Sequence, residues 1–173
     1  MASREEIGLM DLQSILVASV IGYVVGCLQP SYFIGKLKGI DIREHGSKNA
    51  GAANTSMTLG WGLGLFTAAF DVFKATFCVV ITASIYNTPD FHYLPFLSGA
   101  MSIIGHNYPF YMGFDGGKGT ASVIGIMIGF DPMWGWIMVA VIFSSMVITN
   151  YLVIGTVNNY IVLTALCVLK YQS

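Results

Sequence analysis

The sequence contains 173 residues, of which 55% are hydrophobic and 10% are charged, with a formal net charge of −1. Soluble domains carry about a quarter of charged residues, so this composition and the mean hydropathy of +0.69 exclude an ordinary soluble domain and indicate a membrane protein. The nearly neutral charge gives no electrostatic basis for binding nucleic acid, and the three cysteines lack the spacing of a disulfide framework or a metal site.

The predicted elements begin with residues 12–28, an uncharged apolar segment that is about 26 Å long as a helix and ends before Pro30. Residues 36–56 form the first polar loop, which holds four of the eight Lys and Arg residues. A second apolar stretch, residues 57–86, follows and ends at a turn that contains Pro89. We interpret both apolar segments as membrane crossings.

The second half of the chain alternates short and long apolar segments. Residues 93–105 lead into the second polar loop, residues 106–119, and residues 120–130 lead out of it. Because segments of 11–13 residues cannot span a bilayer core about 30 Å thick, we expect half-length helices on both sides of this loop. Two further crossings, residues 133–149 and 151–169, follow.

The positive-inside rule places the first polar loop in the cytoplasm and the N-terminus outside. One crossing out and one back return Lys118 to the cytoplasmic face, and two more bring Asn150 to it. We therefore predict an all-α, polytopic integral membrane helical bundle, with roughly five to seven full or half-length helices around a cytoplasmic-side pocket. In this prediction residues 1–173 form a single transmembrane domain, and its two polar loops contact the substrate.

Gly116, Gly117, Lys118 and Gly119 give the second polar loop the character of an anion site. Successive glycines let backbone N–H groups converge on an anion, and the lysine ammonium adds a positive charge. The run from Thr120 is predicted to be helical, so the positive end of its dipole would lie at the same place. We expect this loop to bind a phosphate group.

The first polar loop carries a hydroxyl at Ser47, an ammonium at Lys48 and amides at Asn49 and Asn54. These groups hold phosphate oxygens and small polyols by hydrogen bonds. Taken alone, the same residues also fit a charged cytoplasmic loop with helix caps. A second loop of glycines and lysine on the same face favours the binding-site interpretation.

His106 borders the second polar loop, where it fits a general base or phosphate ligand, or an interfacial structural residue. Asp71 and Lys74 stand three residues apart in an apolar stretch, where charged residues are usually paired or functional. We expect them to form a structural ion pair in the bundle interior, with direct substrate contact as the alternative.

Two glycine pairs, Gly22/Gly26 and Gly125/Gly129, have the spacing of closely packed membrane helices. The histidines lie on different loops without metal-ligand spacing, so we expect no metal. The sequence lacks Gly-x-x-x-x-Gly-Lys-Ser/Thr, which excludes a P-loop nucleotide site.

The residues of both polar loops together resemble the bacterial acyl-phosphate:glycerol-3-phosphate acyltransferases, the PlsY family. The resemblance rests on the block from Lys36 to Asn54, on Gly105-His106-x-x-Pro109 followed by Gly116-Gly117-Lys118-Gly119, and on Asp71-x-x-Lys74. It implies an integral enzyme of the bacterial cytoplasmic membrane whose active site faces the cytoplasm. Such an enzyme moves a fatty acyl group from acyl phosphate to the 1-hydroxyl of glycerol 3-phosphate, giving lysophosphatidate and phosphate.

An acyl phosphate is a mixed anhydride with a good leaving group, so no protein nucleophile, metal or cofactor is required. The protein positions two anions and offsets their repulsion, while the acyl chain stays in the membrane lipid. We expect catalytic roles for Ser47, Arg43 and His106, with His106 or a substrate phosphate oxygen accepting the hydroxyl proton. The other expected ligands are Lys118 with Gly116, Gly117 and Gly119 for one phosphate, Arg43, Ser47 and Lys48 for the other phosphate, and Asn49 and Asn54 for the polyol.

Three positions depart from the family pattern, because Met57 replaces an arginine, and Asn150 and Val153 replace an arginine and a serine. A C-terminal family motif, His-x-x-Asn followed by Gly-x-Glu, is absent from the sequence. Two alternatives therefore stay open. One is an acyltransferase of the same fold with a less charged acceptor, and the other is a non-catalytic paralogue that binds lipid or a partner.

Overall fold

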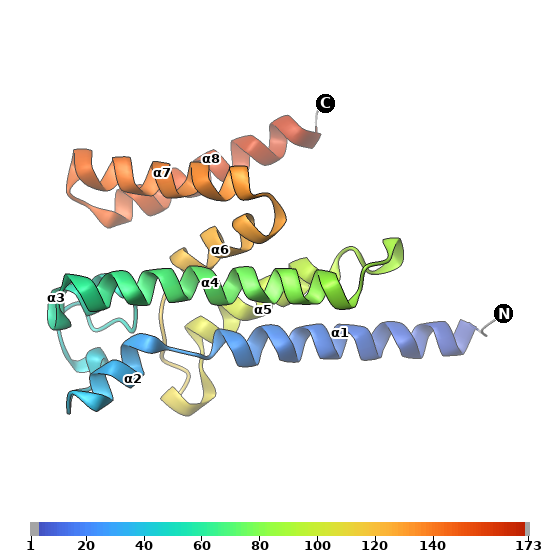
Figure 1. The fold of residues 1–173 in the computed structure, drawn as a ribbon, viewed down its shortest axis with the longest axis horizontal. Coiled ribbons are helices and arrows are strands. Elements are labelled where there is room, and N and C mark those ends of the chain that lie inside the picture. Colours follow the sequence, from blue (N-terminus) through green and yellow to red (C-terminus); the bar gives the residue numbers. More distant parts are fainter. Residues whose placement is uncertain (1–3, 172–173) are drawn as a thin grey trace.

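The computed structural model describes residues 4–171, and that part of the chain contains helices and loops but no strand. The helices are α1 (Arg4–Gly26), α2 (Pro30–Leu37), α3 (Ala52–Leu59), α4 (Trp61–Ile85), α5 (Leu94–Asn107), α6 (Thr120–Phe130), α7 (Pro132–Thr149) and α8 (Leu152–Tyr171) (Figure 1). Four segments of the described chain are long and apolar enough to cross a membrane. With 14 and 11 residues, α5 and α6 are short helices. The predicted all-helical membrane bundle is confirmed.

The outer surface of the bundle is apolar, and polar side chains lie in its interior. Leu65, Phe73 and Val147 expose 61%, 63% and 62% of their surface, whereas Ser98 and Ser102 are fully buried. This distribution is the reverse of that in a soluble protein, and it suits a molecule whose solvent is lipid. The small buried hydroxyl residues also allow neighbouring helices to approach closely.

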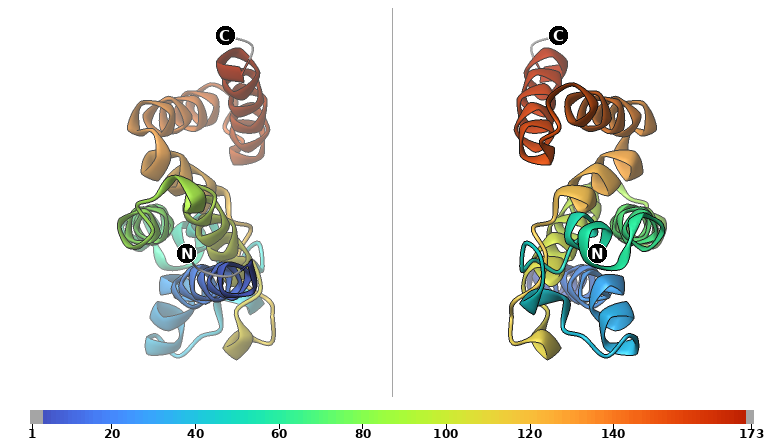
Figure 2. Two further views of the ribbon diagram at one scale, coloured as in Figure 1. Left: turned by 90° about the vertical axis from the view of Figure 1, so that its right-hand side faces the viewer. Right: turned by 90° about the vertical axis from the view of Figure 1, so that its left-hand side faces the viewer.

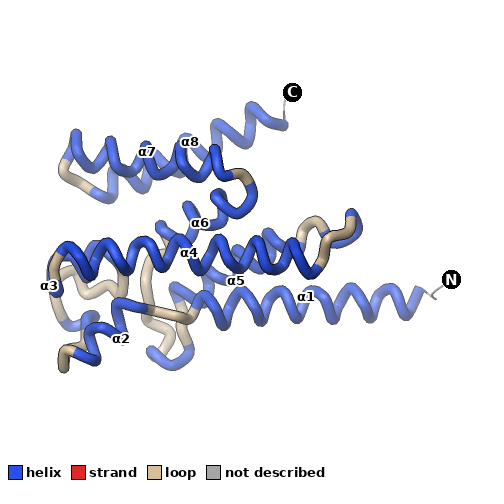
Figure 3. Tube along the Cα trace, in the orientation of Figure 1, coloured by secondary structure: helices blue, strands red, loops and turns tan. Residues whose placement is uncertain are grey.

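The polar connections gather at one end of the bundle, and α1 begins and α8 ends toward the opposite end (Figure 1). The first polar loop, the second polar loop and the α7–α8 turn at Asn150 lie at this common end, among the tan segments of Figure 3. All three junctions therefore lie on one face of the bundle, as the alternation of crossings predicted.

Small residues allow the closest helix contacts. A Cβ atom at Gly22 of α1 would collide with the main chain of Ser98 in α5, and a Cβ at Gly26 would meet α5 one turn further on. At Gly125 of α6, a Cβ would collide with the main chain of Val72 in α4. The expected close packing at both glycine pairs is confirmed, and it holds α1 against α5 and α4 against α6.

Two helix breaks shape the polar end of the bundle. α1 ends at Gly26 and α2 begins at Pro30, because proline lacks the N–H that would continue the helix. The predicted second crossing is α4, and the apolar stretch that begins at Met57 is divided at Gly60, whose φ of 100° suits glycine alone. The first four residues of this stretch therefore belong to α3 and its end and not to the crossing helix.

Figure 2 shows α7 and α8 as a pair set apart from the other helices, with α6 between this pair and the rest of the bundle. Gly155 of α8 packs against Ile142 of α7, and Asn158 of α8 donates a hydrogen bond of 3.0 Å to the Ser145 hydroxyl of α7. The two C-terminal helices therefore hold each other by small-residue packing and a polar contact between their faces.

The close contact between α1 and α5 gives a stability prediction. Gly22→Ala should lower the free energy of unfolding by about 1–3 kcal/mol, because its new methyl group has to displace the Ser98 main chain. The measurement is the thermal unfolding of the detergent-solubilised protein. Gly62→Ala is the matched control, because no atom lies within 4 Å of its added Cβ. Equal melting temperatures for the two variants would contradict the proposed contact.

Candidate active site

The first polar loop is held in shape by Asn54, which lies fully buried in the first turn of α3. Its side-chain amide donates hydrogen bonds to the carbonyls of Ile42 (2.8 Å) and His45 (3.0 Å), and its oxygen accepts one from the Ser47 N–H (2.7 Å). Both amide hydrogens are therefore used inside the loop. Its donors are committed to the protein's own main chain, and the expected contact of Asn54 with a polyol stays a prediction.

Arg43 joins the two polar loops. Its guanidinium forms a bidentate ion pair with Asp41, in which Nε lies 3.0 Å from one carboxylate oxygen and Nη2 lies 2.8 Å from the other. Its Nη1 donates to the carbonyls of Met112 (2.6 Å) and Asp115 (3.4 Å) in the second polar loop. Arg43 therefore acts as a connection between loops. These bonds use four of its five N–H donors, and its expected catalytic and phosphate-binding role stays a prediction.

Electrostatics strengthens this connection. The hydrogen bond to Asp41 is the main reason that the pKa of Arg43 is raised, with smaller contributions from the charges of Asp41 and Asp115, against an opposing effect of burial. The hydrogen bond from Arg43 likewise holds the pKa of the Asp41 carboxyl well below its usual range. Both groups are therefore charged at neutral pH. Asp115, whose negative charge lies beside the predicted phosphate site, is partly offset by Arg43.

The second polar loop folds back on the end of α5 through its main chain. The N–H groups of Gly116 and Gly117 donate to the carbonyls of Asn107 (2.9 Å) and His106 (3.0 Å). These two amides are thus not available to an anion, contrary to our expectation for the glycines. The amides that follow, from Lys118 into the first turn of α6, include those that a helix cannot satisfy internally.

Gly119 lies at the boundary between the loop and α6. Its φ of 74° is left-handed, which glycine adopts without strain, and α6 begins at the next residue. The predicted helix from Thr120 to Phe130 has the same bounds in the structure. Its N-terminus therefore directs the positive end of the helix dipole toward Lys118.

A cavity of about 420 Å³ opens where the two polar loops meet. The loops also touch through a hydrogen bond of 3.4 Å from the Ala50 N–H to the Gly116 carbonyl. The residues that line the cavity are Asn49, Asn107, Tyr108, Phe114, Asp115, Gly116, Gly117 and Lys118. We call it the pocket. Lys118 is its one cationic side chain among these lining residues, and it is exposed to solvent.

The pocket brings together part of the predicted site. Asn49 joins Gly116, Gly117 and Lys118, although 67 or more positions separate Asn49 from them in the chain. Ser47 and Lys48 are exposed on the same loop but lie outside the pocket lining. Their expected contacts with substrate therefore do not follow from this geometry.

Sequence reasoning missed Asn107, Tyr108 and Phe114 in the pocket lining. The side-chain oxygen of Asn107 is buried, and no hydrogen-bond partner for it occurs among the described residues. Because an unpaired buried oxygen is costly, it is a natural acceptor for a ligand hydroxyl. The available signal was the position of Asn107 directly after His106, inside the motif Gly105-His106-x-x-Pro109.

His106 lies outside the pocket lining, and 3% of its surface is exposed. Its Nδ1 is 3.0 Å from the Lys74 ammonium and 3.4 Å from an Asp71 oxygen. Asp71 and Lys74 are themselves 2.8 Å apart and buried, so the geometry fits the predicted ion pair. We call these three residues the buried cluster. The expected role of His106 as general base or phosphate ligand does not fit its burial and its contact with an ammonium group.

The three residues that depart from the family pattern do not line the pocket. Met57 is 71% exposed on α3, Val153 is 72% exposed on α8, and Asn150 ends α7 with a left-handed φ of 59°. The C-terminal motif named above does not occur in residues 4–171. Residues 172 and 173 lie outside the range that the structure describes.

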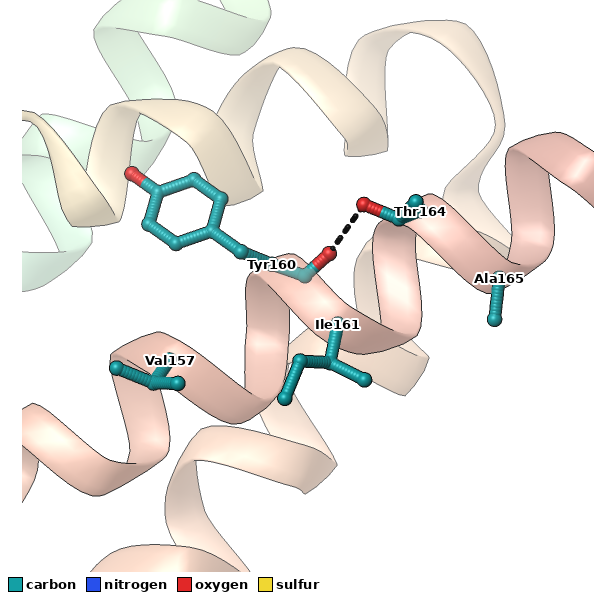
Figure 4. A pocket seen from close by; sticks show the side chains of 5 residues that line it. All are labelled: Val157, Tyr160, Ile161, Thr164 and Ala165. Atoms are coloured by element: carbon teal, nitrogen blue, oxygen red, sulfur yellow. Dashed lines mark hydrogen bonds between the residues drawn. The ribbon is translucent and has the colours of Figure 1, made fainter.

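A second cavity, of about 510 Å³, lies along α8 (Figure 4). Its lining consists of Val157, Tyr160, Ile161, Thr164 and Ala165. The Thr164 hydroxyl donates to the Tyr160 carbonyl of its own helix (2.8 Å), which leaves a mainly apolar wall without a charged group. The cavity between the polar loops is therefore the candidate site for a charged substrate.

Comparisons with known proteins agree with this fold. A family model described as glycerol-3-phosphate acyltransferase matches residues 16–172. Glycerol-3-phosphate acyltransferase 1 of Oceanobacillus iheyensis is 41% identical over 151 residues, which cover 84% of this chain and 73% of the relative. The glycerol-3-phosphate acyltransferase of Halalkalibacterium halodurans is 40% identical, with coverage of 86% and 72%.

Two crystal structures of PlsY (YgiH), an integral membrane glycerol 3-phosphate acyltransferase, have the same fold. The glycerol 3-phosphate form superposes with a TM-score of 0.79 at 26% identity, and covers 88% of this chain and 77% of that protein. The lysophosphatidic acid form has a TM-score of 0.76 at 27% identity, with coverage of 86% and 72%. This chain belongs to the glycerol-3-phosphate acyltransferase family.

Proposed function

We propose that the protein transfers a fatty acyl group from acyl phosphate to the 1-hydroxyl of glycerol 3-phosphate. The observation that carries the proposal is the pocket, whose lining contains Lys118, Asn49 and Asn107, with α6 beginning two residues after Lys118. A cation and a helix N-terminus suit a phosphate, and two neutral amides suit hydroxyl groups. The crystal structure of the related PlsY in its glycerol 3-phosphate form supports this choice of acceptor.

The reaction needs positioning more than acid–base chemistry. The 1-hydroxyl oxygen of the acceptor attacks the carbonyl carbon of the acyl phosphate, and the bond from that carbon to the phosphate oxygen breaks. The hydroxyl proton moves to an oxygen of the departing phosphate, which leaves as inorganic phosphate, and lysophosphatidate remains. Lys118 holds the acceptor and reduces the repulsion between the two anionic substrates.

The acyl chain requires an apolar path beside the pocket. Tyr108 and Phe114 line the pocket and are 56% and 60% exposed, so their rings are available to a lipid chain. We propose that the chain passes these rings and remains in the membrane. The pocket then faces the cytoplasm, a direction supported by the five Lys and Arg residues of the two polar loops.

A different acceptor is the second candidate, and Asp115 is the observation that favours it. Its carboxyl group belongs to a residue of the pocket lining, so the pocket is less positive than Lys118 alone would make it. A less charged alcohol or an amine would then replace glycerol 3-phosphate as the acceptor.

One assay distinguishes the candidates. Purified protein in detergent micelles receives palmitoyl phosphate and one acceptor at a time, and the release of inorganic phosphate is followed. Release with glycerol 3-phosphate is the expected result. Release with another acceptor only would support the second candidate, and no release above the rate of buffer alone would indicate a non-catalytic protein.

Lys118 supplies the first prediction on activity. Lys118→Ala should raise the Michaelis constant for glycerol 3-phosphate by about 10- to 100-fold, because a charged hydrogen bond is worth about 1.5–3 kcal/mol. The measurement is the initial rate against acceptor concentration. Lys38→Ala is the control, because Lys38 is exposed on the first polar loop outside the pocket lining. An unchanged Michaelis constant in Lys118→Ala would remove this role.

The Arg43–Asp41 contact supplies a prediction on pH. Because folding lowers the pKa of Asp41, the carboxylate stabilises the fold above its unfolded pKa of about 4, and this contribution is lost as the pH falls. Asp41→Asn should therefore lower the melting temperature at pH 7, and the gap to the wild type should shrink as the pH falls below about 4. A gap that is independent of pH would contradict the ionic contribution of Asp41.

A further inference from the structure

The imidazole of His106 lies between the Asp71–Lys74 ion pair and the second polar loop. One edge of the ring meets Lys74 and Asp71 through Nδ1. The opposite edge faces Gly117, because a Cβ atom at that position would overlap Nε2. The residue thus connects a buried ion pair with the glycine that precedes Lys118.

The Lys74 ammonium and the Asp71 carboxylate both approach Nδ1 of the ring. The ammonium has three N–H donors, and its partners are the Leu28 carbonyl (2.7 Å), an Asp71 oxygen (2.8 Å) and His106 Nδ1 (3.0 Å). When Nδ1 accepts from the ammonium, a neutral imidazole carries its hydrogen on Nε2. Neither ring nitrogen then has a free lone pair for a substrate proton.

The position of Gly117 depends on His106 in two ways. Its N–H donates to the His106 carbonyl (3.0 Å), which also accepts a hydrogen bond from the side-chain amide of Gln29. Its missing side chain leaves the space that the ring fills. The φ of Gly117 lies outside the left-handed region, so the need for glycine is steric and not conformational.

We infer that His106 is a positioning residue, which sets the place of Gly117 and so of Lys118 in the pocket and does not accept the substrate proton. The kinetic test of this inference rests on the proposed function. The inference adds to that function by naming the residue that holds the phosphate-binding Lys118 in place. Asp71 and Lys74 serve the same purpose through the ring, because they hold its Nδ1 edge.

The test pairs two glycine variants with one change at His106. His106→Asn keeps an oxygen that can accept from Lys74 but removes Nε2, the ring atom nearest to a Cβ at Gly117. Gly116→Ala is the matched control, because its Cβ would meet the His106 and Asn107 carbonyls and Pro109, which His106→Asn leaves in place. The five proteins to compare with the wild type are Gly117→Ala, Gly116→Ala, His106→Asn and the two double variants.

Gly117→Ala should raise the Michaelis constant for glycerol 3-phosphate by about tenfold over the wild type. In the double variant Gly117→Ala/His106→Asn, this constant should lie within about threefold of its value in His106→Asn alone. Gly116→Ala should be equally impaired with and without His106→Asn. His106→Asn itself should change kcat by less than about threefold, whereas loss of a general base costs about 100- to 10,000-fold. A kcat loss of that size, or no recovery in the Gly117 pair, would overturn the inference.

Thermal unfolding separates this inference from the proposed function. Gly117→Ala should lower the melting temperature of the solubilised protein less in the His106→Asn background than in the wild type, whatever acceptor the enzyme uses. If the wild type released no phosphate with glycerol 3-phosphate, the proposed function would fail while this pattern still supported the contact. An equal fall in both backgrounds would overturn the contact itself.

Discussion

Lipid offers no hydrogen-bond partners, so the buried Lys74 ammonium at the polar end of the bundle finds its partners within the protein. Its three contacts reach the broken end of α1 at Leu28, its own helix α4 at Asp71, and α5 at His106. One buried charge therefore joins three helices. Because an unpartnered charge in this environment costs several kcal/mol, the three helices cannot shift separately without losing that contact. The break before Pro30 contributes by freeing the Leu28 carbonyl for the ammonium.

Charged residues near the pocket divide into two kinds. Arg43, Asp41 and the buried cluster have their donors and acceptors committed to the protein, and they shape the two polar loops. Lys118 is exposed in the pocket, and no ion pair or hydrogen bond of its ammonium occurs among residues 4–171. Burial raises the pKa of Tyr111 to about 12, so its hydroxyl stays protonated and donates to the Cys27 carbonyl (2.5 Å). The committed groups thus leave Lys118 as the cation of the pocket lining that can bind a ligand.

Much of the fold could be predicted from the lengths of the apolar segments and from the residues that end helices. The bounds of α6 and the meeting of three polar junctions followed from apolar segment lengths, whereas Gly60 divided a stretch that looked continuous. The site was harder to predict, because residue type does not reveal which partner a side chain finds first. Asn54 and Arg43 look like ligands in the sequence, but their nearest acceptors belong to the main chain. Asn107 looks ordinary, yet it belongs to the pocket lining and its buried side-chain oxygen has no hydrogen-bond partner among the described residues.

The shortness of α6 has a consequence for the membrane around it. Its 11 residues extend about 17 Å, whereas the 23 residues of α1 extend about 35 Å, against a hydrocarbon core of about 30 Å. Where a helix of this length meets lipid, local thinning of the bilayer is one way to accommodate it, at a cost of a fraction of a kcal/mol per ångström. A thinner bilayer of shorter lipids reduces this cost. The chain length that the proposed reaction attaches therefore influences the thickness of the membrane in which the protein itself resides.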